Sequence, residues 1–108
     1  MITIWGGGAM EKSELSPEVK QQVTKFFKVI GDQTRFSILY LLKGRELNVT
    51  EIAQALDMEQ SAISHQLQVL RESKLLKSRR DKRSVYYSQA DDHVYEIISQ
   101  AIEHMCEE

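Results

Sequence analysis

The feature that most constrains this 108-residue chain is a pair of helical patterns, within residues 48–73, that only three residues separate. The first pattern starts at Asn48, which together with Glu51 has the residue types of a capping box. This pattern stops before residues 57–59, which predict a turn, and residues 60–73 predict a longer second helix. Two helices joined by so short a turn predict a helix-turn-helix.

The longer helix has two chemically different faces. At about 100° per residue, its apolar residues share one broad arc, made of Ala62, Ile63, Leu67, Val69 and Leu70. The helix start and the opposite arc carry uncharged hydrogen-bonding side chains, namely Gln60, Ser61, Ser64, His65 and Gln68. Such groups can donate to and accept from base edges in a DNA major groove, so this arc is either a DNA-reading face or an ordinary polar surface. Gln66 is an exception, since it is polar but lies inside the apolar arc.

Charge is segregated along the chain, although the net formal charge is only −2. Residues 71–83 hold seven Lys or Arg and two acidic residues, a net charge of +5 beside the predicted helix-turn-helix. Residues 89–108 hold six acidic residues and no Lys or Arg. A basic block next to a helix-turn-helix suits DNA phosphate, whereas an acidic terminal segment suits something cationic.

A β-hairpin is predicted directly after the helix-turn-helix. Residues 75–80 and 84–88 alternate and favour strands, and they flank a short charged turn at residues 81–83. Four cations gather around the tip, namely Arg79, Arg80, Lys82 and Arg83. A solvated tip is the alternative, but cations this dense favour a wing that reaches backbone phosphate or the minor groove.

Helices on both sides of this motif complete the predicted fold. Residues 16–18 (Ser-Pro-Glu) have the residue types of a helix start, and the apolar period then runs to Gly31. A second helix is predicted over residues 33–43, with Asp32 as its cap and Gly44 after its end. The sequence therefore predicts a mainly α fold with a small β-hairpin, a winged helix-turn-helix.

The aromatic residues Phe26, Phe27 and Tyr40 lie at helical spacing, and we assign them to the core rather than to a ligand pocket. The last helix is predicted to begin at Asp91 or Asp92. It carries apolar residues that suit packing against a partner helix, namely Val94, Ile97, Ile98, Ala101, Ile102 and Met105. Because a domain this small buries a modest core, dimerisation through the N- and C-terminal helices is expected.

Residues 10–108 are predicted to form a single domain. Residues 1–9 lack a helical pattern and contain three glycines, so we interpret them as a disordered extension. Either the natural start is Met10 or this extension is a cloning remnant. The chain has one cysteine, no secretory signal and no apolar run of about 20 residues, which is the length of a membrane span. A cytoplasmic protein with no membrane partner is therefore expected.

Four residues of the last helix have the chemistry of metal ligands: Asp91, His93, His104 and Glu107. At least eleven residues separate the first pair from the second, or about 16 Å of helix, so one ion cannot bridge both pairs within a chain. Two antiparallel copies of the helix would instead bring together Asp91 and His93 of one chain with His104 and Glu107 of the other. That arrangement gives two four-ligand sites per dimer, which suit Zn(II) or Co(II). Ordinary surface residues are the alternative.

Three segments resemble the ArsR/SmtB family of bacterial metal-responsive repressors. Residues 26–35 (Phe-Phe-Lys-Val-Ile-Gly-Asp-Gln-Thr-Arg) resemble its opening signature, and residues 61–70 resemble its recognition helix. The Arg-rich hairpin that ends in residues 85–88 (Val-Tyr-Tyr-Ser) resembles its wing. The resemblance implies a winged-helix homodimer that binds operator DNA when metal-free and releases it when metal binds.

The resemblance also bears on the metal site. Zinc and cobalt sensors of this family carry an Asp-x-His pair early in the last helix, which Asp91 and His93 match in type and spacing. They carry a His-x-x-His or His-x-x-Glu pair late in the same helix, which His104 and Glu107 match. Thiolate sensors use cysteines before the recognition helix, but residues 46–51 contain none, so that site is expected to be absent.

The predicted function is therefore a transcriptional repressor that binds an imperfect palindrome and is released by Zn(II) or Co(II). One alternative is a family member that senses nickel or no metal. Another is a winged-helix module that binds only proteins, which the uncharged reading face and the cationic wing argue against. An enzyme is not expected, because four protein ligands would leave a metal no open position.

Overall fold

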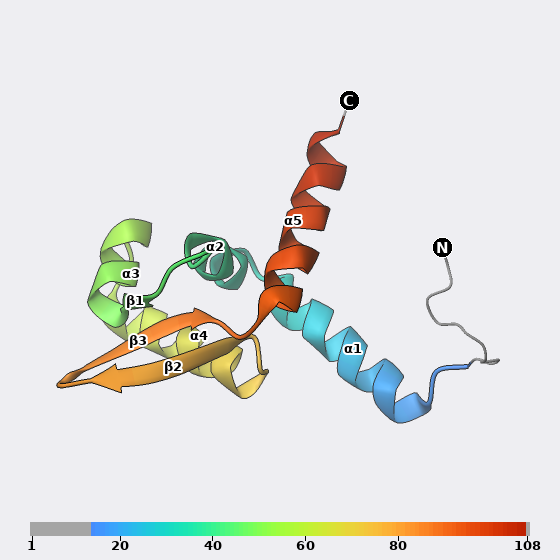
Figure 1. Cartoon of the computed structure of the whole chain (residues 1–108), viewed down its shortest axis with the longest axis horizontal. Helices are drawn as coiled ribbons and strands as arrows, with labels where there is room; N and C mark the ends of the chain where they lie inside the picture. The colour runs from blue at the N-terminus through green and yellow to red at the C-terminus, as the bar shows by residue number, and fades with distance from the viewer. Residues whose placement is uncertain (1–13, 108) are drawn as a thin grey trace.

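Residues 14–107, the part of the chain that the computed structural model describes, form helices and a small antiparallel sheet whose hairpin projects at one end of the molecule (Figure 1). The elements follow in the order α1 (Pro17–Ile30), α2 (Gln33–Leu41), β1 (Leu47–Asn48), α3 (Val49–Leu56), α4 (Gln60–Glu72), β2 (Leu76–Asp81), β3 (Ser84–Gln89) and α5 (Asp92–Cys106). The predicted mainly α fold with a hairpin is confirmed. The interpretation of residues 1–9 as an extension lies outside the described residues.

The first two helices begin at the predicted caps. The Ser16 hydroxyl accepts a hydrogen bond of 3.1 Å from the backbone N–H of Val19 at the start of α1. Asp32 caps α2 in the same way, since its Oδ2 accepts from the N–H of Arg35 at 3.0 Å. Helix α2 ends at Leu41, two residues earlier than predicted. The chain then turns through Gly44, whose positive φ of 70° is open to glycine without strain.

The helix-turn-helix consists of α3, a short turn and α4. At the start of α3, Asn48 Oδ1 accepts from the N–H of Glu51, and Glu51 Oε1 accepts from the N–H of Asn48, both at 2.9 Å. This reciprocal pair is the predicted capping box. Asp57 ends α3 in the left-handed conformation, which turns the chain into α4 within three residues. The local sequence therefore determines where α3 starts, whereas α4 begins after Glu59 without a side-chain cap.

The three strands form an antiparallel sheet in the order β1-β3-β2. In the wing hairpin Arg79 lies opposite Tyr86, and Asp81 lies opposite Ser84. The turn therefore consists of Lys82 and Arg83 alone, one residue shorter than predicted, because Asp81 pairs within the sheet. Lys82 has a positive φ of 60°, as two-residue hairpin turns require.

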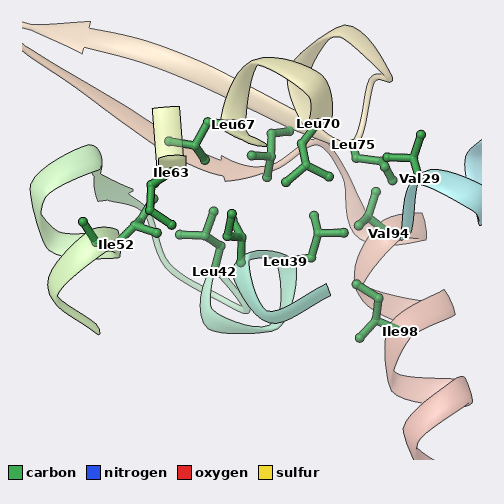
Figure 2. Packing of buried hydrophobic residues seen from close by; sticks show 13 residues of the cluster. Val29, Leu39, Leu42, Ile52, Ile63, Leu67, Leu70, Leu75, Val94 and Ile98 are labelled. Carbon is green, nitrogen blue, oxygen red and sulfur yellow. The ribbon is translucent and has the colours of Figure 1, made fainter. Parts of the chain in front are cut away.

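The inner face of α4 packs on α2, with α5 at one end of the cluster (Figure 2). Ile63, Leu67 and Leu70 are completely buried. Ala62 is exposed, so the buried arc of α4 is narrower than the sequence predicted. The remaining core side chains are Val29, Ile38, Leu39, Leu42, Ile52, Ala53, Leu75, Leu76, Val94 and Ile98.

Two of the three aromatic residues assigned to the core are not in it. Phe26 is partly buried against the cluster, but Phe27 is 55% exposed and Tyr40 is 47% exposed. Helical periodicity shows which face of a helix is apolar but not what covers that face. For these two residues the prediction of a core position within the chain was wrong.

The first and last helices expose apolar side chains at the end of the molecule opposite the wing tip (Figure 1). Along α1 and just before it, Leu15, Val19, Val23 and Phe27 recur at every fourth residue and are each at least 42% exposed. On α5, Met105 is 80% exposed. A stripe at this spacing lies on one side of a helix. It is the kind of surface that a second copy of the chain would bury.

Candidate DNA interface and metal ligands

The five residues predicted to read DNA all lie exposed on α4, and they are Gln60, Ser61, Ser64, His65 and Gln68. The buried side chains of Ile63, Leu67 and Leu70 fix the rotation of the helix, which turns this face outward. In the free chain, the Gln68 amide donates to Glu72 Oε2 at 3.1 Å. The arrangement presents hydroxyl, imidazole and amide groups that can reach base edges.

The structure explains Gln66, the polar residue inside the apolar arc. Its Oε1 accepts a hydrogen bond of 2.9 Å from Nη1 of Arg35, which lies in the first turn of α2. The Nε of the same guanidinium donates to the carbonyl oxygen of Val29 at 2.8 Å. The sequence signalled that Gln66 was anomalous, but not that its partner lies 31 residues away.

One of the four wing cations is already paired. The guanidinium of Arg79 donates from both Nε and Nη2 to Oε1 of Glu46 and lies over the ring of Tyr86, 5.1 Å from its centroid. The hydrogen bond from Arg79 lowers the pKa of Glu46 below its ordinary value, and the same bond raises the pKa of Arg79. Glu46 lies 33 residues from its partner, so no local sequence pattern identifies it as a functional residue.

The other three wing cations are differently placed. Arg80 lies on β2, and Lys82 and Arg83 form the turn. All three are exposed, and within residues 14–107 no ion pair or side-chain hydrogen bond engages them. An unpaired cation at a hairpin tip can contact phosphate without first breaking an internal contact.

The first predicted pair of metal ligands lies at the start of α5. Asp91 is its N-cap, and Oδ1 accepts from the N–H groups of His93 at 3.0 Å and Val94 at 3.3 Å. The Nδ1 of His93 lies 3.5 Å from that same oxygen. The His93 side chain is 84% exposed, so its imidazole is accessible to a ligand.

The second predicted pair lies at the other end of the helix. His104 is in the last turn and is exposed, while Glu107 is the C-cap. Glu107 has extended backbone angles (φ −69°, ψ 142°), so it does not continue the helical course of the residues before it. In the part of the chain that the structure describes, no three metal-binding side chains come together. One protomer thus offers two separate pairs.

Comparison with known proteins identifies the family of the chain. Residues 32–78 match the model of the protein family described as "Bacterial regulatory protein, arsR family". A transcriptional repressor SmtB homolog from Synechocystis sp. is 38% identical over 99 residues, which cover 87% of this chain and 75% of the relative. The chain belongs to the ArsR/SmtB family. The predicted family is therefore confirmed.

Two further proteins place this ArsR/SmtB member among regulators. A cadmium resistance transcriptional regulatory protein, a CadC homolog from Staphylococcus aureus, is 33% identical over 97 residues, covering 89% of this chain and 80% of the relative. The homodimeric winged helix-turn-helix DNA-binding domain of Mb0332 from Mycobacterium bovis superposes with a TM-score of 0.77. That comparison covers 89% of this chain and 94% of the other, at 28% identity.

The family and the fold together determine the class of protein. This ArsR/SmtB member is a DNA-binding transcriptional regulator and not an enzyme, as predicted. In residues 14–107, none of the helices combines the length and the apolar character needed to span a bilayer.

Proposed function

We propose that the chain is a transcriptional repressor whose metal-free homodimer binds an imperfect palindromic operator in the bacterial cytoplasm, and that Zn(II) or Co(II) releases it. The observation that carries the metal-responsive part is the placement of two exposed donor pairs at opposite ends of α5. The names of the two relatives, a repressor and a cadmium resistance regulator, support the same reading.

In this proposal α4 enters the major groove. Ser61, Ser64 and His65 face base edges, Gln60 contacts DNA at the helix start, and Gln68 leaves Glu72 to join them. The phosphate contacts come from Arg80, Lys82 and Arg83, because Arg79 is held by Glu46. A two-fold dimer would place its two α4 helices about 34 Å apart, one turn of DNA, which gives the operator its palindromic form.

The dimer in this proposal forms through α1 and α5. The side chains of the stripe from Leu15 to Phe27 remain 42–55% exposed in the described chain, and together they form a large apolar patch. Contiguous apolar surface of this kind marks an interface. Burying it also adds core to a domain that is small on its own.

The donor atoms fit a borderline divalent metal. Each metal site would consist of Asp91 and His93 from one protomer, with His104 and Glu107 of the partner subunit, which gives two sites per dimer. Imidazole nitrogens with carboxylate oxygens are ligands that Zn(II) and Co(II) accept. Asp91 and His93 already lie side by side with both side chains exposed, so this pair is arranged for a ligand before one binds.

A bound ion would supply a link between the two protomers. By joining the start of one α5 to the end of the other, these residues would hold the dimer at a single separation of its reading helices. If DNA binding needs a different separation, bound metal weakens DNA binding. DNA must then weaken metal binding by the same factor, because the coupling between the two sites is reciprocal. An imidazole binds a metal only in its neutral form, so metal binding competes with protons at both histidines.

Fluorescence anisotropy on DNA from just upstream of the gene tests the proposal. Chelator-treated protein should bind tightly, and zinc should weaken binding at least tenfold. His104→Ala should retain apo binding and lose the zinc response, whereas Glu103→Ala, an exposed neighbour on α5, should keep both. Release of His104→Ala by zinc would refute the ligand assignment. Absence of specific binding by the metal-free wild type would refute the repressor.

A further inference from the structure

We infer that Arg35 and Gln66 form a positioning pair, which ties the DNA-reading helix to the dimerisation helix and so sets the separation of the two reading helices in the dimer. This inference rests on the proposed function, because it assumes that a dimer reads two half-sites. It assigns a role to two residues that the DNA and metal sites leave unused.

The guanidinium of Arg35 contacts two helices other than its own. Its Nε donates to the carbonyl of Val29, in the last turn of α1, at 2.8 Å. That carbonyl belongs to the last four of the helix, which have no partner within it. The same guanidinium donates from Nη1 to Gln66 in the middle of α4, at 2.9 Å. One planar group therefore joins α1 and α4 while its backbone belongs to α2.

One end of this link lies on the proposed dimerisation helix α1, and the other end lies on the DNA-reading helix α4. Val29 is buried, but the other side of α1 exposes the stripe that includes Val23 and Phe27, the proposed dimer surface. Gln66 directly follows His65 in the reading helix, and its own side chain is partly buried. A change in the angle between α1 and α4 would thus move the reading face relative to the two-fold axis.

Directional bonds hold such an angle better than apolar contacts do. Ile63, Leu67 and Leu70 fix how α4 is rotated over the core, but apolar packing is non-directional. The guanidinium has donors in a fixed planar array, so satisfying two acceptors at once fixes the direction of both. A lysine at Arg35 would keep the charge and lose that array.

The inference predicts a difference between two kinds of DNA. In Gln66→Met, which removes the acceptor at nearly constant volume, affinity for the two-half-site operator should fall five- to tenfold. Affinity for a DNA with one half-site, measured at low salt, should change less than twofold, because α4 keeps its place over its own core. Arg35→Lys should lose operator affinity in the same way as Gln66→Met. Gln66→Glu, which keeps an acceptor at this position, should bind the operator about as tightly as the wild type.

The double variant Arg35→Lys/Gln66→Met serves as the control. If both residues act through one bond, the double variant should lose no more affinity than the worse single variant. Equal losses on both DNAs, or no loss on either, would overturn the inference, and so would additive losses in the double variant. Sedimentation and circular dichroism would verify that each variant is a folded dimer.

Amide hydrogen exchange gives a readout that needs no DNA. Gln66→Met should speed exchange at the end of α1 as well as around position 66 in α4, while exchange in the wing strands stays unchanged. If the wild type binds no operator, the proposed function fails, yet the exchange comparison still tests the link. Unchanged exchange at the end of α1 would refute it.

Discussion

The pairing of Arg79 with Glu46 predicts that the four wing cations contribute unequally to DNA binding. Arg83 is exposed at the hairpin turn, whereas Arg79 already donates two hydrogen bonds to a carboxylate. Only a cation that neutralises phosphate releases counterions from DNA, so only that cation steepens the salt dependence of affinity. The difference between the two arginines is therefore measurable as a salt slope.

The magnitude follows from the number of phosphates. Arg83→Gln removes one contact from each wing, so the slope of log K against log salt should become shallower by about 1.8 for the dimer. Between about 50 and 200 mM salt, the variant should lose about 12-fold less affinity than the wild type loses. The double variant Glu46→Gln/Arg79→Gln removes an ion pair without changing net charge, and its slope should match the wild type.

Fluorescence anisotropy on one operator at four or five salt concentrations gives these slopes. The two variants are matched in kind, since both replace wing arginines by glutamine. If the double variant loses as much slope as Arg83→Gln, Arg79 leaves Glu46 for phosphate in the complex and the reasoning fails. If Arg83→Gln leaves the slope unchanged, Arg83 does not contact phosphate and its assignment is refuted.

Two further predictions concern single side chains. Asn48→Ala should lower the free energy of unfolding by about 1 kcal/mol, because the cap of α3 is lost, while Asn48→Asp should retain most of that free energy. Urea denaturation measures the free energy of unfolding of both variants, and equal losses would contradict the capping role. The carboxyl of Glu46 should titrate below its ordinary pKa of 4.5 in an NMR pH series and return toward 4.5 in Arg79→Gln. Because this folded-state pKa is lowered, the stabilising contribution of the pair is complete above 4.5 and is lost as pH falls through the lowered value. An unchanged titration in the variant would exclude Arg79 as the cause.

Short-range features of the fold were predictable because their causes are local. Asn48 and Glu51 are three residues apart and bond to each other's backbone, so the start of α3 is readable from the sequence. The same holds for the Ser16 and Asp32 caps and for the outward face of α4. The hairpin was predicted to within a residue at each strand end, since strand propensity and turn residues act over a few positions.

The sequence predicted where the apolar faces of the helices lie, but not which part of the protein covers them. Phe27 lies at the helical spacing of the sequence pattern, yet it is more than half exposed in the chain. The hydrophobic effect rewards burial without regard to which molecule supplies the cover. A periodic apolar face is therefore equally compatible with an intrachain core and with an interface between copies.

The pairs that the sequence did not reveal share one property, which is a large separation along the chain. Glu46 meets Arg79 across 33 residues, and Arg35 meets Gln66 across 31. Helical periodicity carries no information over such separations, but a polar residue within an apolar helix face does. A partly buried amide left without a partner would cost about 1–3 kcal/mol, so Gln66 inside an apolar arc already implies a donor from elsewhere in the fold. In the structure that donor is Arg35, which belongs to α2. Because the Gln66 amide accepts from a residue of another helix, the position of α4 depends on Arg35. This dependence is the physical basis for assigning Arg35 and Gln66 a positioning role.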